Sequence, residues 1–289
     1  MKIGITINKK SYTPEAFAYK KYLTNLGHEV ELAPSEDLST NNDINIYFLG
    51  KKTKKTSAIE VHEYHSLSTP PLAKLKDYIK SKINCTPNGR IFLNDFVKKH
   101  LNFNDNTKYI YRDMGVDDIF FDQPPQKKEF DIVYCGSIQN RKGLIDRINK
   151  LSDLGLSICL IGKIENHTYK QLNNKKNIHC TGKLSRSEIP VLYAKSHCGL
   201  NYTPDIYPYN QQTSTKTLEY LATGINCLTN KYKWINHLEE KTRITLIDIE
   251  DDNLIQKIRG ESSIKISRDD FEWTNILKKC DLENFLINL

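Results

Sequence analysis

The sequence predicts an α/β protein built from two Rossmann-like domains. Its 289 residues reach the size at which chains divide, because single hydrophobic cores stop growing at about 250 to 300 residues. Apolar runs of strand length alternate with helical stretches along the chain. A polar segment with a proline pair, residues 121–130, interrupts this alternation and is the expected linker. We therefore expect domains at residues 1–125 and 126–289.

The first half begins with a strand at residues 2–7 and a helix at residues 14–26. Gly27 ends this helix, because glycine readily adopts the left-handed conformation found at helix ends. The loop between them, residues 8–13, lacks the G-x-G-x-x-G pattern of dinucleotide-binding domains, so we expect no dinucleotide here. The remaining expected elements are strands at 28–32, 44–49, 58–61, 91–93 and 108–111 and a helix at 72–82.

The second half repeats the alternation of strands and helices. A strand at residues 131–135 leads through a turn at residues 136–140 to a helix at 144–151, and a strand at 156–161 stops at Gly162. The remaining expected elements are strands at 178–181, 199–202, 226–229 and 245–247 and helices at 186–194 and 215–222.

The composition is that of a globular protein, with 38% hydrophobic and 27% charged residues. No apolar run approaches the roughly 20 residues of a membrane-spanning helix. Asn8, Lys9 and Lys10 end the first apolar run, which is too short for a signal peptide, so we expect a cytoplasmic protein. The seven cysteines are widely spaced with no C-x-x-C pair, and we expect buried thiols rather than disulfides or metal ligands.

The formal net charge of +7 fits three partners: an anionic substrate, an acidic membrane surface or nucleic acid. The densest basic run, Lys51–Lys55, is short and also fits an ordinary solvated loop. We expect no nucleic acid partner. Together with the stretch Lys74–Lys82, this run suits peripheral contact with a membrane surface.

The segment of residues 207–229 carries the clearest functional pattern. Polar residues lead into a helix whose first turn contains Ser214, Thr215 and Lys216, and Gly224 ends it. Helix N-termini offer unpaired N–H groups and partial positive charge, so a diphosphate can bind there with Lys216 as counter-charge. Glu219 lies one turn further, within reach of a ribose hydroxyl. An ordinary capped surface helix explains the same residues.

The order Lys-x-x-Glu-Tyr-x-Ala-x-Gly at residues 216–224 resembles the signature of the retaining GT-B glycosyltransferases of family 4. In that family two acidic residues have seven residues between them. The second contacts the donor ribose and corresponds to Glu219. The first contacts the donor sugar and corresponds to Gln211, which can donate hydrogen bonds to a sugar but carries no charge.

Two further segments resemble the same family in the expected order. Gly136 and Ser137, followed by Arg141 and Lys142, resemble the glycine loop that opens the donor domain. The resemblance implies that Lys142 faces the diphosphate, while Arg141 replaces an arginine that the family often has at the position of Ser137. The second segment, which resembles the loop whose backbone meets the nucleobase, contains Gly182, Lys183 and Leu184. A plain strand-to-helix connection fits that segment as well.

In the first half the resemblance implies an acceptor-side histidine, for which His65 is the first choice and His62 the second. Arg112 precedes a segment like the family's Asn-Gly-Val-Asp and either adds positive charge to the site or pairs with Asp113. Trp273 resembles the tryptophan of the closing helix, which often packs toward the first domain. A core tryptophan is the alternative.

The resemblance implies a GT-B fold, two Rossmann-like domains facing across a cleft, and transfer of a sugar from a nucleotide sugar with retention. No cofactor and no metal are expected. The acceptor is expected to be a glycan or a lipid-linked glycan at the inner face of the membrane, in surface polysaccharide or glycoconjugate synthesis. The rivals are an epimerase or phosphorylase of this fold and a nucleotide-sugar-binding protein without turnover.

Overall fold

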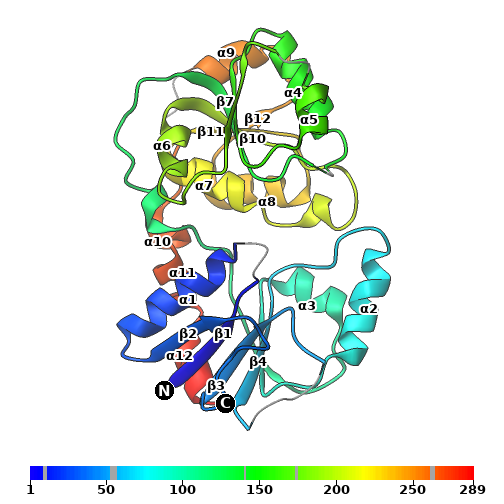
Figure 1. The fold of residues 1–289 in the computed structure, drawn as a ribbon, viewed down its shortest axis with the longest axis vertical. Coiled ribbons are helices and arrows are strands. Elements are labelled where there is room, and N and C mark those ends of the chain that lie inside the picture. The colour runs from blue at the N-terminus through cyan, green and yellow to red at the C-terminus, as the bar shows by residue number, and fades with distance from the viewer. Residues whose placement is uncertain (9–11, 53–56, 140, 173–174, 261–263) are drawn as a thin grey trace. The chain divides into compact units, whose positions relative to one another are not determined.

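The structure is a computed structural model that describes residues 1–289 except 9–11, 53–56, 140, 173–174 and 261–263. The chain forms two compact units (Figure 1). Unit 1 comprises Met1–Gly115 and Asp269–Leu289, and unit 2 comprises Val116–Arg268. Parts of three sequence predictions lie outside the described residues: positions 9–11 of the first loop, Lys54 and Lys55 of the basic run, and Asn140 of the turn.

Unit 1 contains a six-stranded sheet in the order β2-β1-β3-β4-β5-β6, and every neighbouring pair is parallel. The order reverses between β1 and β3, as in Rossmann-like domains. Because both faces of a parallel sheet are covered, the central strands are almost continuously buried. The strands are β1 (Lys2–Thr6), β2 (Glu29–Ala33), β3 (Ile44–Phe48), β4 (Ile59–Tyr64), β5 (Gly89–Phe92) and β6 (Lys108–Tyr111).

The helices of unit 1 come from both ends of the chain. Pro14 begins α1, where its missing N–H costs nothing, and Asn94 caps α3 by accepting a hydrogen bond from the Val97 N–H at 3.0 Å. The C-terminal segment packs against strand β5. The Leu289 side chain comes so close to Gly89 that a Cβ on this glycine would lie only 2.7 Å from it. The helices are α1 (Pro14–Asn25), α2 (Ala73–Ile83), α3 (Asp95–Leu101), α11 (Trp273–Lys279) and α12 (Leu282–Ile287), and α10 (Arg268–Phe271) begins at the last residue of unit 2.

Unit 2 has a second six-stranded parallel sheet, in the order β12-β11-β10-β7-β8-β9. Its core is formed by fully buried aliphatic side chains of the central strands, among them Ile132, Leu160, Leu200 and Leu228. The strands are β7 (Phe130–Cys135), β8 (Ile158–Ile161), β9 (Ile178–Gly182), β10 (Ser196–Asn201), β11 (Asn226–Thr229) and β12 (Ile247–Asp248).

Six helices and two short 3-10 turns are described in unit 2. The expected helices at 144–151 and 215–222 are present within two residues of their predicted ends. The helices are α4 (Leu144–Asp153), α5 (Asn166–Gln171), α6 (Ile189–Ala194), α7 (Thr215–Thr223), α8 (Lys233–Thr242) and α9 (Leu254–Arg259), and the turns are η1 (Asp118–Phe120) and η2 (Tyr209–Gln211). The predicted fold class, α/β with two Rossmann-like domains, is confirmed.

The chain passes between the units earlier than the polar segment at 121–130 suggested. Phe120 and Phe121 are buried within unit 2, and the Phe120 ring lies 5.7 Å from that of Tyr193. The apolar residues just before the polar segment therefore belong to unit 2, and the division falls between Gly115 and Val116 rather than at residues 125 and 126. Residues 269–289, expected in the second domain, are part of unit 1.

None of the described helices has the length and hydropathy that a membrane span requires. All seven cysteines are free thiols, and the four outside the deepest core, Cys85, Cys135, Cys180 and Cys280, are half-buried. Cys159, Cys198 and Cys227 are fully buried, and burial raises the pKa of each thiol.

Candidate functional site

The sheet of unit 2 reverses its order between β10 and β7, so the carboxyl ends of these two strands form its topological switch point. The connection after β7 leads toward β8 on one side, whereas the connection after β10 leads toward β11 on the other. In open parallel sheets, ligands bind at this switch point. Gly136 directly follows β7, and Tyr202 directly follows β10.

Lys216, in the first turn of α7, reaches over the end of β7. A Cβ on Gly136 would lie 3.0 Å from Cε and 3.5 Å from Nζ of Lys216, and this Nζ lies 5.5 Å from the centroid of the Tyr134 ring. Loss of solvent, and next the positive charge of Arg141, lower the pKa of Lys216 to about 8. Gly136, Arg141 and Lys216, which the sequence placed in one donor site, are therefore brought together.

Ser214 fixes the start of α7. Its hydroxyl accepts a hydrogen bond from the Thr217 N–H at 3.3 Å and donates one to Asn201 Oδ1 at 3.0 Å. The Asn201 amide donates in turn to Thr229 Oγ1 at 3.3 Å and to the Tyr232 hydroxyl at 3.4 Å. The end of β10 thus holds the N-terminus of α7 against β11, and the first N–H groups of α7 point out of its N-terminal end.

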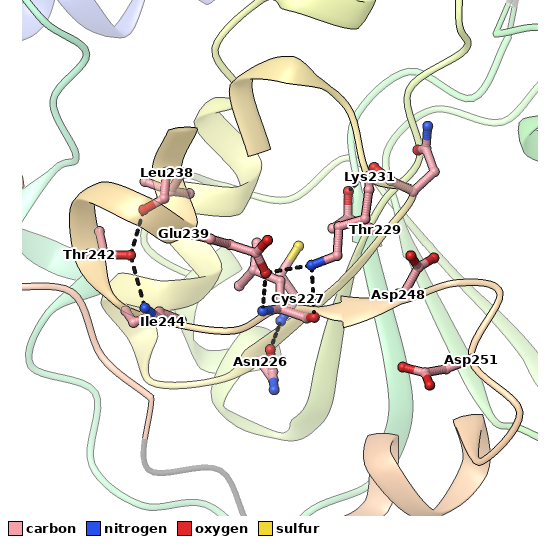
Figure 2. Close-up of polar contacts among 12 residues, drawn as sticks. Asn226, Cys227, Thr229, Lys231, Leu238, Glu239, Thr242, Ile244, Asp248 and Asp251 are labelled. Atoms are coloured by element: carbon pink, nitrogen blue, oxygen red, sulfur yellow. Dashed lines mark hydrogen bonds and ion pairs between the residues drawn. The ribbon is translucent and has the colours of Figure 1, made fainter. Parts of the chain in front are cut away.

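A polar network joins the loop after β11 to α8 and to the segment that leads into β12 (Figure 2). Lys231 forms an ion pair with Glu239 and donates a hydrogen bond to the Leu246 carbonyl at 3.1 Å, while Glu239 accepts from the Leu246 N–H at 2.7 Å. Thr242 donates to the Leu238 carbonyl and accepts from the Ile244 N–H. These hydrogen bonds connect the end of α8 with residues 244–246, which lead into β12.

Three glycines lie at the carboxyl ends of β7, β8 and β9. Gly162 has φ 143°, and a Cβ there would lie 2.6 Å from the Gly136 carbonyl oxygen. Its N–H donates to the Gly182 carbonyl at 2.9 Å. The close approach requires glycine at position 162 and links the loop after β9, with Lys183 exposed and Leu184 half-buried, to the end of β7. The sequence pattern indicated Gly162 only as the end of a strand.

The turn before α4 also depends on glycine. Gly143 has φ 81°, and a Cβ there would lie 2.6 Å from the Tyr202 hydroxyl. Arg141 is half-buried, whereas Lys142 and Ser137 are exposed on the same loop. The positive charge of Arg141 acts on Lys216 and contributes to its lowered pKa.

Glu219 is buried one turn into α7 and is already paired. Its carboxylate accepts a hydrogen bond from Arg186 at 2.7 Å and another from the Tyr193 hydroxyl at 3.3 Å. Arg186 also lies 4.5 Å from the Phe120 ring centroid. Sequence reasoning missed Arg186, since its only signal is an arginine at the start of an expected helix.

Gln211 lies in the 3-10 turn that precedes α7, where its backbone N–H donates to the Pro208 carbonyl at 3.0 Å. Among the contacts of the described residues, none connects its side chain to Lys216 or Glu219. The structure therefore places Gln211 in the loop after β10 without joining it to the other predicted donor residues.

In unit 1, His65 follows β4 at the carboxyl edge of the sheet. Its ring lies edge-on to that of Phe48, 5.5 Å away, and its Nδ1 is buried without a hydrogen-bond partner among the described residues. His62 is instead fully buried within β4, and burial lowers its pKa to about 3, so that it stays neutral. Of the two candidates, only His65 lies at the edge where ligands bind in such sheets.

Arg112 lies in the core of unit 1. It is fully buried and pairs with Glu63, donates from Nε to the Tyr19 hydroxyl at 3.1 Å, and donates to the backbone carbonyl of Asp113 at 3.3 Å. Its guanidinium also lies 5.1 Å from the centroid of the Trp273 ring. A buried carboxylate needs a cationic partner, so Arg112 serves the core of unit 1.

One group of the described residues has the donor atoms of a metal site. Cys85 Sγ lies 3.7 Å from Glu60 Oε2 and 3.9 Å from His62 Nε2. These separations are close to the edges of a tetrahedral zinc site. However, Lys51 Nζ lies 2.5 Å from Glu60 Oε1 and compensates its charge, so a cation would have to displace Lys51. We assign this group to the core.

No protein-family model matches the sequence, and no curated protein is significantly similar to it. Solved structures are similar over the whole chain. AviGT4, a glycosyltransferase of avilamycin A biosynthesis, is 13% identical with a TM-score of 0.68, covering 100% of this chain and 98% of that one. Anabaena HepE in complex with UDP-glucose is 12% identical with a TM-score of 0.67, covering 100% of both chains. A putative UDP-N-acetylglucosamine 2-epimerase of Listeria monocytogenes is 10% identical with a TM-score of 0.53, covering 98% and 96%.

At these identities the likeness concerns the fold, and the expected GT-B fold is confirmed by it. The chemistry must be argued from the side chains. The carboxyl end of β7 brings together a desolvated ammonium, the N-terminus of α7 and glycines that let a ligand approach the backbone. This combination is suited to a phosphorylated ligand.

Proposed function

We propose that the protein is a glycosyltransferase whose nucleotide-diphosphate sugar binds at the carboxyl edge of the unit 2 sheet. The observation that carries this proposal is the position of Lys216: a desolvated ammonium over Gly136, in the first turn of α7, at the switch point of the sheet. Such a cation is costly without an anion, and a diphosphate supplies one.

The role of Lys216 in this reaction is electrostatic. When the bond between the anomeric carbon and the diphosphate oxygen breaks, the electron pair and negative charge go to that oxygen. A fixed ammonium and the N–H groups of α7 stabilise this charge more than the neutral bond. Arg141 and Lys142 are proposed to add positive charge on the loop after β7, and the Gly182–Leu184 backbone is proposed to contact the nucleobase.

Glu219 keeps its proposed contact with the ribose. Its two oxygens each accept one hydrogen bond, from Arg186 and Tyr193, and a carboxylate oxygen can accept two. A ribose hydroxyl can thus add a bond without breaking the ion pair. Gln211 is proposed to hydrogen-bond the sugar, and His65 to act on the acceptor side.

The finer features of the reaction rest on the sequence resemblance. We propose transfer with retention, without a metal ion or cofactor, to a glycan or lipid-linked glycan in surface polysaccharide or glycoconjugate synthesis. The cytoplasmic side of the membrane is the proposed location. The proposal includes no nucleic acid partner.

A donor screen tests the proposal. UDP, GDP, ADP and CMP are compared by their effect on thermal unfolding, and UDP is the first choice because HepE was solved with UDP-glucose. A ligand at about a hundred times its dissociation constant adds roughly 2.7 kcal/mol to stability, which is readily measured. Hydrolysis of the matching sugar nucleotides is then followed. No stabilisation by any of the four, with and without divalent metal, would refute the proposed site.

An epimerase or a non-catalytic binding protein is the second candidate, favoured by the similar epimerase structure and by the uncharged Gln211. Product analysis separates a glycosyltransferase, an epimerase and a binding protein. A glycosyltransferase moves the sugar off the nucleotide, an epimerase changes the sugar while it remains on the nucleotide, and a binding protein leaves the nucleotide sugar unchanged. Gln211→Glu restores the acidic residue of the family pattern. Unchanged donor turnover in this variant would show that Gln211 does not contact the sugar.

A further inference from the structure

Helix α2 of unit 1 exposes its apolar side chains to solvent. The exposed fractions are 50% for Leu75, 61% for Tyr78, 44% for Ile79 and 43% for Ile83, and Leu72 just before the helix is 69% exposed. Figure 1 shows α2, in cyan, at the outside of unit 1 beside α3. No other described helix carries so many exposed large hydrophobic side chains.

The side of α2 that faces the protein is small and polar. Ala73 and Asp77 are buried, and Asp77 accepts a hydrogen bond from the Ser68 N–H at 2.9 Å and lies 3.6 Å from Lys80 Nζ. Residues along a helix turn by about 100° each, so Leu75 and Ile79 project opposite the buried pair. Most surface helices turn their apolar side chains toward the core, whereas α2 turns them toward solvent.

The exposed charged residues of α2 are all positively charged. Its acidic residue, Asp77, is buried, while three lysines are exposed: Lys74 and Lys76 flank the apolar stripe, and Lys82 lies within it. Lys76 Nζ donates to the Thr69 carbonyl at 3.1 Å, and Lys82 lies 5.7 Å from the Tyr78 ring centroid, so neither of these contacts neutralises the ammonium. The exposed face thus combines an apolar stripe with cations.

We propose that α2 is a membrane-docking helix that lies flat on a bilayer containing anionic phospholipids. Apolar side chains enter the boundary between headgroups and acyl chains, Tyr78 lies at the headgroup level, and the lysines contact anionic headgroups. This inference deepens the proposed function, since it rests on an acceptor held at a membrane, and it assigns the surface that brings the enzyme there.

Charge decides between a bilayer and a second copy of the chain. A two-fold dimer through α2 would bring the lysine-bearing face of one copy against the same face of the other, because such an interface pairs a surface with itself. Like charges brought together in an apolar interface oppose association. An anionic bilayer instead complements both the apolar stripe and the lysines.

The test measures partition of the full chain onto vesicles, without nucleotide or acceptor. Vesicles of phosphatidylcholine mixed with phosphatidylglycerol are compared with phosphatidylcholine alone by co-sedimentation. We expect binding to the mixed vesicles that weakens as salt rises, and a loss of about 30-fold in Lys76→Ala/Lys82→Ala, since each lysine contributes about fivefold. Leu75→Glu/Ile79→Glu should lose at least as much.

Leu154→Glu is the matched control, because Leu154 is 51% exposed but belongs to unit 2. It should bind as the unchanged protein does. Equal vesicle binding by Leu75→Glu/Ile79→Glu and the unchanged protein, or no binding by the latter, overturns the proposal. A dimer that Leu75→Glu/Ile79→Glu dissociates, without vesicle binding, would assign the face to a second copy. Nucleotide stabilisation of each variant is measured separately, so that failure of the docking helix and failure of the donor site are distinguished.

Discussion

Lys216 Nζ lies over the end of β7 in a position where a Cβ on Gly136 would come within 3.5 Å of it. The ammonium has lost much of its solvent, and its pKa is lowered to about 8. The protein therefore holds a cation whose charge is disfavoured until an anion arrives. The first three predictions concern this relationship.

Lys216→Ala should weaken binding of the preferred nucleoside diphosphate by about 10- to 100-fold, the range expected for one charge-assisted hydrogen bond. Calorimetric titration measures this directly. Lys170→Ala, which removes an exposed lysine of unit 2 outside the proposed donor site, should bind as the unchanged protein does. Equal affinities for Lys216→Ala and Lys170→Ala would place the diphosphate elsewhere.

Nucleotide affinity should fall as pH rises above about 8. The diphosphate favours protonated Lys216 and so raises its pKa on binding, whereas the free protein loses this proton above its pKa of about 8. The affinity should then decrease by up to about tenfold per pH unit, because binding must restore the proton. Titrations between about pH 7 and about pH 9.5 test this, and Lys216→Arg, which stays charged, should flatten the profile.

Lys216→Met should stabilise unit 2 in the absence of nucleotide. The pKa is about 8 in the folded state and about 10.4 in the unfolded chain. The destabilisation caused by the desolvated, half-buried ammonium is therefore complete below pH 8 and disappears as pH rises to about 10.4. We expect a gain of about 1 to 3 kcal/mol at neutral pH that shrinks in alkali. Urea unfolding with Trp273→Phe in the background leaves Trp234 to report on unit 2 alone. A destabilised variant at neutral pH would contradict this.

Gly162→Ala should destabilise unit 2 by about 3 to 5 kcal/mol, because the new Cβ meets the Gly136 carbonyl oxygen and φ is positive. Gly155→Ala separates the two causes, since its φ is 80° but no atom lies within 4 Å of the added Cβ. That variant should lose only about 1 kcal/mol. Similar losses in both variants would mean that the close approach carries no cost.

Arg112→Leu should destabilise unit 1 by about 3 to 5 kcal/mol, because it leaves Glu63 buried without its cation. Arg112→Leu with Glu63→Leu removes both charges and should recover much of the loss. Unfolding is followed through Trp273, with Trp234→Phe in the background. The ion pair would be unimportant if the single variant unfolded at the urea concentration of the unchanged protein.

The sequence predicted the fold well where local signals are strong. The helix that begins after Ser214 has a capping residue, a regular apolar side and a terminal glycine, and α7 follows that prediction closely. Helices α3, α5, α8 and α9 were not predicted. Each is short, from six to ten residues, and short helices depend on tertiary contacts, such as the Lys231–Glu239 pair for α8.

Long-range partners were the less predictable part of the candidate site. Nothing near Glu219 in the sequence indicates Arg186, which lies 33 positions earlier, and nothing near Arg112 indicates Glu63. The contact of Gly162 with Gly136 joins the ends of two strands, which only the register of the sheet reveals. The sequence shows which side chains can carry charge or hydrogen-bond a ligand. Which of these side chains contact one another is shown only by the folded chain.

The attachment of residues 269–289 to unit 1 has a consequence for synthesis on the ribosome. Helices α11 and α12 cover Gly115 and Gly89 of unit 1, yet they are translated after all of unit 2. Unit 2 is one continuous stretch and can complete its core while unit 1 still exposes the surface that these helices cover. The part of the protein translated first is thus the last to be finished, and the nascent chain must keep that surface from aggregating until the final helices emerge.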